Sequence, residues 1–215
     1  EIERLAAEAE LKALRAQINP HFLFNALNTI GYLIESAPPR ALKTLLRLTS
    51  LLRSVLTSDG EITTLGREID LVNHYLDIEK ERFEERLRVT VDVPAALRVL
   101  PIPCLIVQPL VENAVKHGVA PSIPGGHVHI AAGLDAGRGT PTLVITVENT
   151  GAPLTAPADD ATRVGLGNVE RRLAGHYGRA ATLVLRAVDG VTRAEIRLPA
   201  TPAARSADTS ARAAG

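Results

Sequence analysis

Apolar residues recur at helical spacing in the first part of the chain. At about 100° per residue, one face of the segment around residues 17–34 carries these apolar residues: Leu23, Leu27, Ile30 and Ile34. The opposite face carries polar and aromatic residues: Gln17, His21, Asn25, Asn28 and Tyr32. An apolar stripe at this spacing is typical of a core-facing side. The pattern predicts a long helix over residues 1–36, kinked before His21 by Pro20, with His21 pointing outward.

A second helix is predicted over residues 40–58, after the breaker at 36–39. Its apolar residues surround most of its circumference: Leu42, Leu45, Leu46, Leu48, Leu51, Leu52, Val55 and Leu56. Such a helix needs several apolar neighbours, which one partner helix cannot supply. We therefore expect a four-helix bundle made by two chains. A contact with the C-terminal part of the same chain is the alternative.

The rest of the pattern predicts a mixed fold. A third helix is expected over 66–84 and a strand over 88–93, whose apolar residues alternate. The elements expected after it are a helix at 103–117, strands near 127–133 and 142–149, a helix at 166–177, and strands near 181–187 and 192–198. This order predicts an α+β sandwich with helices on one face of a sheet. An irregular stretch is expected at 152–163.

Composition narrows the partners and the compartment. The 215 residues include 24 basic and 24 acidic ones, so no net field favours nucleic acid and we expect no nucleic-acid partner. A single cysteine, Cys104, excludes an internal disulfide and suits a reducing cytoplasm. No apolar run approaches the length that crosses a bilayer.

Two helices carry candidate chemistry. His21 is expected on an exposed face with Phe22 and Phe24 beside it, and exposed aromatic side chains are typical of docking surfaces. An ordinary surface histidine is the alternative. In helix 103–117, Asn113, Lys116 and His117 fall opposite the apolar side, together with Pro109 and Leu110. An amide oxygen beside cations suits a magnesium triphosphate, and a solvated polar face is the alternative.

Two glycine-containing segments add weaker signals. The strand ending at Asn149 and Gly151 would let backbone approach a flat ligand, although an ordinary turn fits equally well. The run Gly165-Leu166-Gly167-Asn168 precedes the helix predicted at 166–177. Unpaired N–H groups at such a helix start can hold phosphate, and a flexible helix start is the alternative.

Four motifs in order resemble the LytS-like group of sensor histidine kinases. They are QINPHFLFNALN at 17–28, LDIEKERF at 76–83, QPLVENAVKHG at 108–118 and GLGNVERRL at 165–173. The similarity covers about residues 10–198. It implies a helical dimerisation and phosphoacceptor domain at 1–60 and a connecting helix at 61–86. It further implies an α/β-sandwich ATP-binding domain of the GHKL (Bergerat) type at 87–199. The composition after Pro199, rich in Ala, Ser and Thr, predicts a disordered tail at 200–215.

The resemblance also implies site residues. His21 would be the phosphoacceptor, Asn113 the Mg²⁺ ligand, and Lys116 and His117 would lie near the phosphates of ATP. Asn149 and Gly151 would contact adenine. Residues 152–164 would form a short mobile lid. The residues after the lid would bind phosphate: Gly165, Leu166, Gly167 and Asn168. Aspartate is usual at position 149 and a glycine near position 153, so Asn149 and Pro153 depart from the family pattern and bear on adenine affinity.

The implied activity is autophosphorylation on His21 with ATP and Mg²⁺, followed by transfer to an aspartate of a response regulator, with a LytTR-type regulator as one candidate. A homodimer is implied, as the cytoplasmic portion of an inner-membrane protein whose sensor precedes residue 1. No general base is assigned, because Phe22 follows His21 where commoner kinases have an acid. Two alternatives remain. The first is a GHKL-superfamily ATPase, disfavoured because Pro109 occupies the position of its water-activating glutamate. The second is a catalytically silent dimerisation module, kept open by Asn149 and Pro153.

Overall fold

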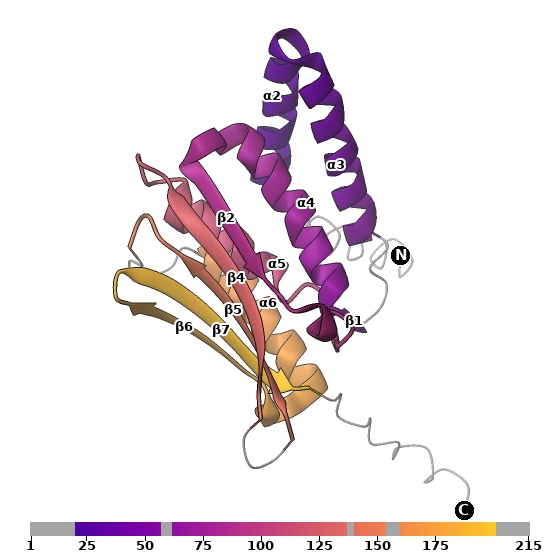
Figure 1. Ribbon diagram of the computed structural model, residues 1–215, viewed down its shortest axis with the longest axis vertical. Coiled ribbons are helices and arrows are strands. Elements are labelled where there is room, and N and C mark those ends of the chain that lie inside the picture. The colour runs from indigo at the N-terminus through magenta and orange to yellow at the C-terminus, as the bar shows by residue number, and fades with distance from the viewer. Residues whose placement is uncertain (1–19, 57–61, 137–139, 154–159, 201–215) are drawn as a thin grey trace, which may run out of the picture.

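The computed structural model describes residues 20–56, 62–136, 140–153 and 160–200, with the backbone alone given for 160–164. Figure 1 shows a pair of helices standing on one side of a domain built from a sheet and further helices. A long helix, α4, lies between the pair and the sheet. Within these residues no helix combines the length and apolar character needed to span a membrane.

The paired helices are α2 (Pro20–Ser36) and α3 (Pro38–Leu56), joined at Ala37. Pro38 and Pro39 cannot continue α2 because proline has no N–H group to donate. The Ala37 N–H still donates to Leu33 O at 2.8 Å, which closes the last turn. The two helices pack against each other and against α4, so α4 supplies a neighbour within the same chain. The described part of the helix predicted over 1–36 is thus α2, while the predicted kink lies outside the described residues.

The buried side of α2 differs from the predicted one. It consists of Phe22, Ala26, Ile30 and Leu33. Phe22 is 7% exposed, whereas Leu27 and Ile34 of the predicted stripe are 48% and 59% exposed. The cause is α4, because the ring of Phe22 packs 4.9 Å from that of Tyr75. Periodicity within a single helix does not reveal where a distant helix will pack, so the expectation that Phe22 is exposed was wrong.

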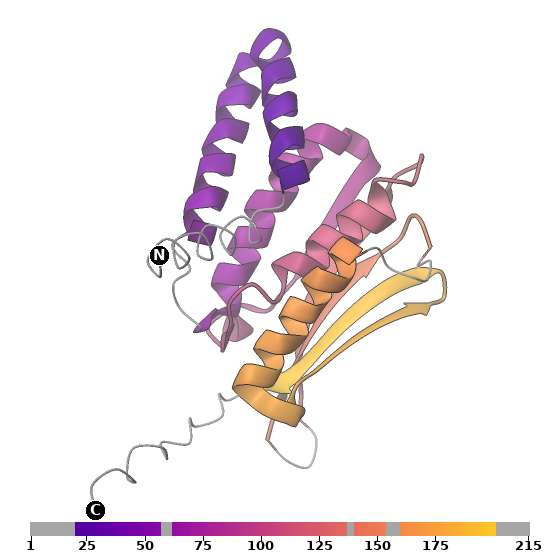
Figure 2. The ribbon, with the colours of Figure 1, turned by 180° about the vertical axis from the view of Figure 1, so that it is seen from behind.

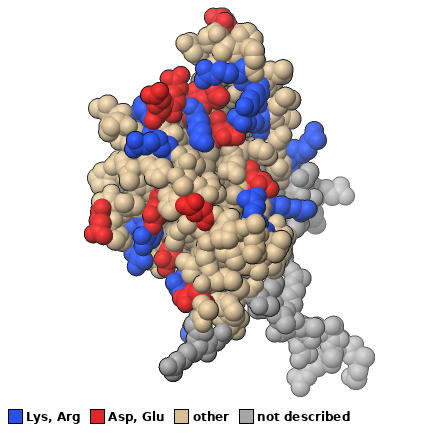
Figure 3. Space-filling view, viewed as in Figure 1, with Lys and Arg blue, Asp and Glu red and all other residues tan. Residues whose placement is uncertain are grey.

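Helix α4 (Leu65–Phe83) begins at an N-cap, where Thr64 Oγ1 accepts from the N–H of Arg67 at 3.3 Å. Ion pairs join it to α3. The side chain of Arg40 lies 2.7 Å from Glu81, and that of Arg47 lies 2.9 Å from Asp77. Acidic and basic side chains accordingly intermingle on the upper part of the face shown in Figure 3. A 3₁₀ turn (Glu84–Arg86) then leads into the sheet.

The main sheet has five strands: β2 (Leu87–Asp92), β4 (Gly126–Asp135), β5 (Thr142–Asn149), β6 (Thr182–Val188) and β7 (Val191–Pro199). Their order is β2-β4-β5-β7-β6, with β2 parallel to β4 and the other pairs antiparallel. Two short strands, β1 (Ile62–Thr64) and β3 (Pro101–Pro103), pair separately, and a 3₁₀ turn occupies Ala95–Leu97. The predicted strands are confirmed within a few residues.

Helices cover one face of this sheet, as Figure 2 shows. They are α5 (Gln108–Asn113), continued by a π-helical turn (Ala114–Val119), and α6 (Asp160–Tyr177), which a 3₁₀ turn (Gly178–Ala180) ends. Strand β5 alternates accordingly, with Leu143, Ile145 and Val147 buried toward the helices. A mixed α/β architecture with helices on one sheet face is therefore confirmed.

Two helix boundaries differ from the expectation. Residues 104–107 form a turn, so the helix predicted over 103–117 begins at Gln108. Leu110, predicted on its polar side, is buried because α4 and α6 pack against α5. Helix α6 begins at Asp160, within the stretch predicted to be irregular. The glycine run at 165–168 therefore lies inside a helix and not before one.

Candidate functional site

His21 lies on an exposed side of the first turn of α2, as predicted. One helical turn later, the side-chain nitrogen of Asn25 lies 3.3 Å from Nδ1 and 3.4 Å from Nε2 of His21. A carboxamide N–H donates to whichever ring nitrogen is unprotonated, so Asn25 can orient the imidazole while the other nitrogen carries the proton. The sequence placed Asn25 on the His21 face without giving it a role. Phe24 is exposed beside it, as predicted.

The three polar residues of the predicted nucleotide helix fall at the change from α-helix to π-helix. The N–H of Ala120 donates to Val115 O at 2.8 Å, a five-residue separation that widens the turn. Asn113 is half-buried, Lys116 exposed and His117 half-buried. The amide nitrogen of Asn113 is buried and has no hydrogen-bond partner among the residues that the structure describes. Such an unpaired polar group is unusual in a folded protein, and it is shared among the described residues by His74, Gln108 and Tyr177.

The end of this helix meets the end of β5. Asn149 is 5% exposed, and a Cβ built on Gly118 would lie 2.0 Å from its side-chain nitrogen. The N–H of Ala152 donates to Gly118 O at 2.8 Å. Gly151 has a φ of +119°, which only glycine adopts readily. The structure thus brings together Gly118 with Asn149 and Gly151, the residues implied for adenine contact.

The glycine run implied for phosphate contact has a different geometry. Gly165 and Gly167 lie beyond the first turn of α6, where backbone N–H groups are already paired within a helix. Asn168 accepts from Arg171, and Leu166 is half-buried. In this conformation the run offers no cluster of unpaired N–H groups to a phosphate. The argument from a helix start was therefore wrong.

Sequence reasoning missed two side chains at the turn before α5. Glu68 of α4 is 3% exposed and accepts from the N–H groups of Leu105, Ile106 and Val107 at 2.7, 3.1 and 3.1 Å. Burial raises the pKa of Glu68, and the backbone N–H groups oppose that rise. From α6, Arg172 donates to Cys104 O at 2.5 Å. A charged residue at an apolar position of α4 was the available signal for Glu68.

A second buried carboxylate lies further along α4. Burial raises the pKa of Glu79 to about 7, and the nearby Glu112 adds to this rise. Arg82, with Nη1 at 3.3 Å from Glu79 Oε2, opposes it. Tyr75 lies in the same group, and burial raises the pKa of its hydroxyl well above the usual value, with Glu79 contributing. These groups lie between α2, through the Phe22–Tyr75 contact, and α5, which carries Glu112.

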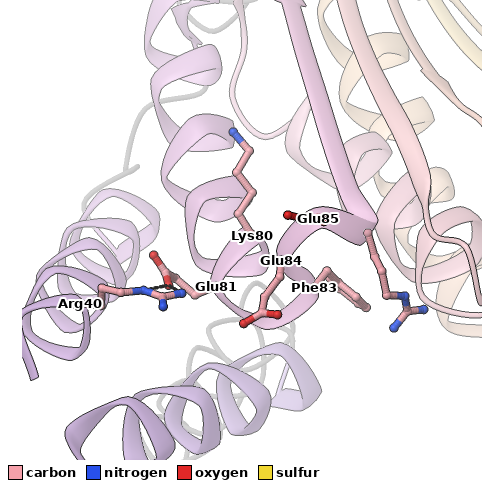
Figure 4. Close-up of a pocket in the computed structure, with 7 residues that line it drawn as sticks. Arg40, Lys80, Glu81, Phe83, Glu84 and Glu85 are labelled. Atoms are coloured by element: carbon pink, nitrogen blue, oxygen red, sulfur yellow. Dashed lines mark hydrogen bonds and ion pairs between the residues drawn. The ribbon is translucent and has the colours of Figure 1, made fainter. Parts of the chain in front are cut away.

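A surface hollow of about 460 Å³ lies at the far end of α4 (Figure 4). Arg40 and Glu81 point toward each other there and form an ion pair. The other lining residues are Lys80, Phe83, Glu84, Glu85 and Arg86. None of the residues implied for nucleotide binding lines this hollow. We therefore do not assign it to the nucleotide.

Comparison with known proteins agrees with the motifs. Residues 9–87 match the model of the histidine kinase family. The chain is 37% identical over 196 residues to the sensor histidine kinase BtsS of Escherichia coli K12, covering 91% of this chain and 34% of that protein. It is 35% identical over 182 residues to YesM, a sensor histidine kinase of Bacillus subtilis, covering 83% and 31%. The chain thus spans about a third of the length of these relatives.

Among solved structures, the histidine kinase domain of the blue-light activated kinase EL346 from Erythrobacter litoralis aligns at 15% identity and a TM-score of 0.48, covering 93% of this chain and 94% of that one. The family match and the relatives place this protein in a defined class. The chain belongs to the sensor histidine kinases, in the group that includes LytS.

Proposed function

We propose that this chain is the kinase region of a sensor histidine kinase and transfers the γ-phosphoryl group of ATP to a ring nitrogen of His21. The new N–P bond forms as the bond between the γ-phosphorus and the β,γ-bridging oxygen breaks, and ADP leaves. Such a transfer requires an accessible nucleophile and alignment more than a strong base. The observation that carries the proposal is the exposed position of His21 on α2. The hydrogen bond from Asn25 to the unprotonated ring nitrogen must open before that nitrogen attacks, and the proton on the other nitrogen leaves to solvent.

Nucleotide binding is proposed on the α5 side of the sheet. Asn113, which is half-buried at the end of α5, would hold Mg²⁺ through its side-chain oxygen. No group of three or more metal-binding side chains occurs among the described residues, so the remaining ligands would be phosphate and water oxygens, as magnesium commonly takes. Mg²⁺ would neutralise charge on the phosphates. Lys116 and His117 would contact the phosphates, and Asn149 and Gly151 the adenine.

The glycine run requires a further step. Gly165, Leu166, Gly167 and Asn168 would reach the phosphates after the first turns of α6 unwind. Two glycines in these turns lower the free energy cost of unwinding, since each costs a helix about 1 kcal/mol relative to alanine. Residues 152–164 would then move as the lid.

Dimerisation is proposed through the helical pair. Exposed apolar side chains remain on α2 and α3 in the single chain: Leu27, Ile34, Leu42, Leu45 and Leu46. A second copy that covers them would form a four-helix bundle.

We retain the proposed division into residues 1–60, 61–86, 87–199 and 200–215, with the amendment that α4 also packs on the helical pair. The exposed Phe24 beside His21 would contribute to docking of a response regulator, the proposed acceptor, which a LytTR-type protein would suit. A membrane-bound sensor is proposed to precede the chain.

The test uses γ-labelled ATP with magnesium on the wild-type protein and on Asn113→Asp. We expect label on the wild type, none on Asn113→Asp, and the same melting temperature for both. Asp70→Asn, the opposite exchange at an exposed position that pairs with Arg98, should keep the label. Turnover of ATP without label on the protein would indicate an ATPase instead, and absence of nucleotide binding would indicate a silent dimerisation module.

A further inference from the structure

The turn that leads into the nucleotide helix has no cap of its own. The residue before α5, Val107, makes no side-chain capping hydrogen bond. Leu105 has a φ of +54°, a conformation that a leucine adopts at a cost in free energy. The N–H groups of the turn just before α5 also need partners, because the turn is buried. Glu68 of α4 supplies them, since it accepts from three successive N–H groups, at Leu105, Ile106 and Val107.

This arrangement fixes the turn from two sides. From α4, the carboxylate of Glu68 accepts hydrogen bonds from the N–H groups of the turn. From α6, the guanidinium of Arg172 donates to the carbonyl of Cys104. At the far end, Arg86 donates to Ser122 O at 2.7 Å, just beyond the π turn. An acid at the start of a helix and a cation beyond its end both complement the helix dipole. Both groups belong to α4 or to the turn that follows it.

We propose that Glu68 is a positioning residue, which fixes the nucleotide helix, and with it Asn113, to α4. This role rests on the proposed function, since Asn113 acts only if the protein binds ATP. Helix α4 also contacts the helical pair through Tyr75 with Phe22 and through Asp77 with Arg47. A displacement of α4 relative to the His21 helix would therefore carry the nucleotide helix with it.

The test compares Glu68→Gln with Asp70→Asn, which lies two residues away on the same helix and is exposed. Glutamine keeps the size of the side chain and removes the charge and one acceptor. In Glu68→Gln we expect amide hydrogen exchange at residues 105–107 to accelerate about tenfold or more, while exchange in β5 and β7 stays unchanged. The KM for ATP should rise severalfold. Asp70→Asn should change neither quantity.

Unchanged exchange at 105–107 in Glu68→Gln would overturn the proposal, as would equal acceleration throughout the sheet, which indicates general destabilisation. If Glu68→Gln does not fold, amide hydrogen exchange of the wild type tests the proposal. The amides of Ile106 and Val107 must then be protected nearly as well as those of β5, and exchange at the rate of an open loop would refute the role of Glu68. The hydrogen-exchange measurements need no nucleotide. Protected amides in a wild type that binds no ATP would instead refute the proposed function.

Discussion

Gly118 and Asn149 are so close that a methyl group on Gly118 would lie 2.0 Å from the side-chain nitrogen of Asn149 and 2.7 Å from its Cγ. Asn149 is buried, so its side chain cannot simply rotate into solvent. The end of the π turn therefore packs against the end of β5 with no room for a side chain at position 118. This contact joins two segments that the family motifs assign separately to phosphate and adenine.

Gly118→Ala should lower the free energy of unfolding by about 1–3 kcal/mol, the usual cost of overpacking. Thermal or denaturant unfolding would measure it. Gly175→Ala is a matched control, because a Cβ at Gly175 meets no atom within 4 Å. The double variant Gly118→Ala/Asn149→Ala should recover part of the loss, since the shorter side chain makes room. Strict additivity of the two single effects would contradict the contact.

The glycines of α6 give a second prediction. Gly167→Ala should raise the melting temperature by about 2–4 °C, since it stabilises a helix by about 1 kcal/mol and a Cβ there meets no atom within 4 Å. If the first turns of α6 unwind around phosphate, the same change should weaken ATP binding severalfold. Gly175→Ala, near the other end of α6, should stabilise equally without affecting ATP. Calorimetric titration measures the ATP affinity of Gly167→Ala and of Gly175→Ala. Equal affinity in these two variants would exclude unwinding of the first turns of α6.

Glu79 predicts a pH dependence of stability. Its pKa is raised from 4.5 to about 7 in the folded state, mainly by burial. The contribution of Glu79 to the free energy of unfolding is therefore complete below pH 4.5. It declines as pH rises through about 7, because the buried carboxylate must then ionise. The loss should reach about 1–3 kcal/mol. Glu79→Gln should remove this decline in denaturant unfolding between pH 5 and pH 7.5, whereas Glu85→Gln, exposed on the following turn, should retain it. Identical pH profiles for wild type and Glu79→Gln would disprove the assignment.

Leu27 tests the proposed dimer. Because its side chain is 48% exposed in the single chain, Leu27→Asp should leave the helical pair folded. In a four-helix bundle the same change would place an unpaired charge in the core and cost about 3–5 kcal/mol of association. Light scattering at micromolar concentration should show a dimeric wild type and a monomeric variant. Tyr32→Asp, at an exposed position of the same helix, is the control and should stay dimeric. A monomeric wild type would end the bundle hypothesis.

Local patterns predicted the strands well, because alternation such as that of Leu143, Ile145 and Val147 records burial directly. They failed where a distant segment decides. Phe22 is buried by Tyr75, which lies far along the chain, and no periodicity within α2 contains that information. Gly165 and Gly167 indicated a helix start, yet the helix extends through them.

The candidate site divides in the same way. The pattern of residues nominated His21 and Asn113 as candidates, and the family resemblance alone nominated Asn149. Glu68 escaped notice, since its partners are backbone N–H groups of another segment, and backbone groups carry no sequence signature. Arg172 was missed for the same reason, because it binds the carbonyl of Cys104.

The central claim is that His21 receives the phosphoryl group. The most direct measurement incubates the protein with γ-labelled ATP and magnesium, then follows the label in acid and in alkali for the wild type, His21→Gln and His129→Gln, the last on the sheet and paired with Asp92. We predict label that is lost in acid and stable in alkali on the wild type and on His129→Gln, and none on His21→Gln. Acid-labile label that persists on His21→Gln would contradict the account.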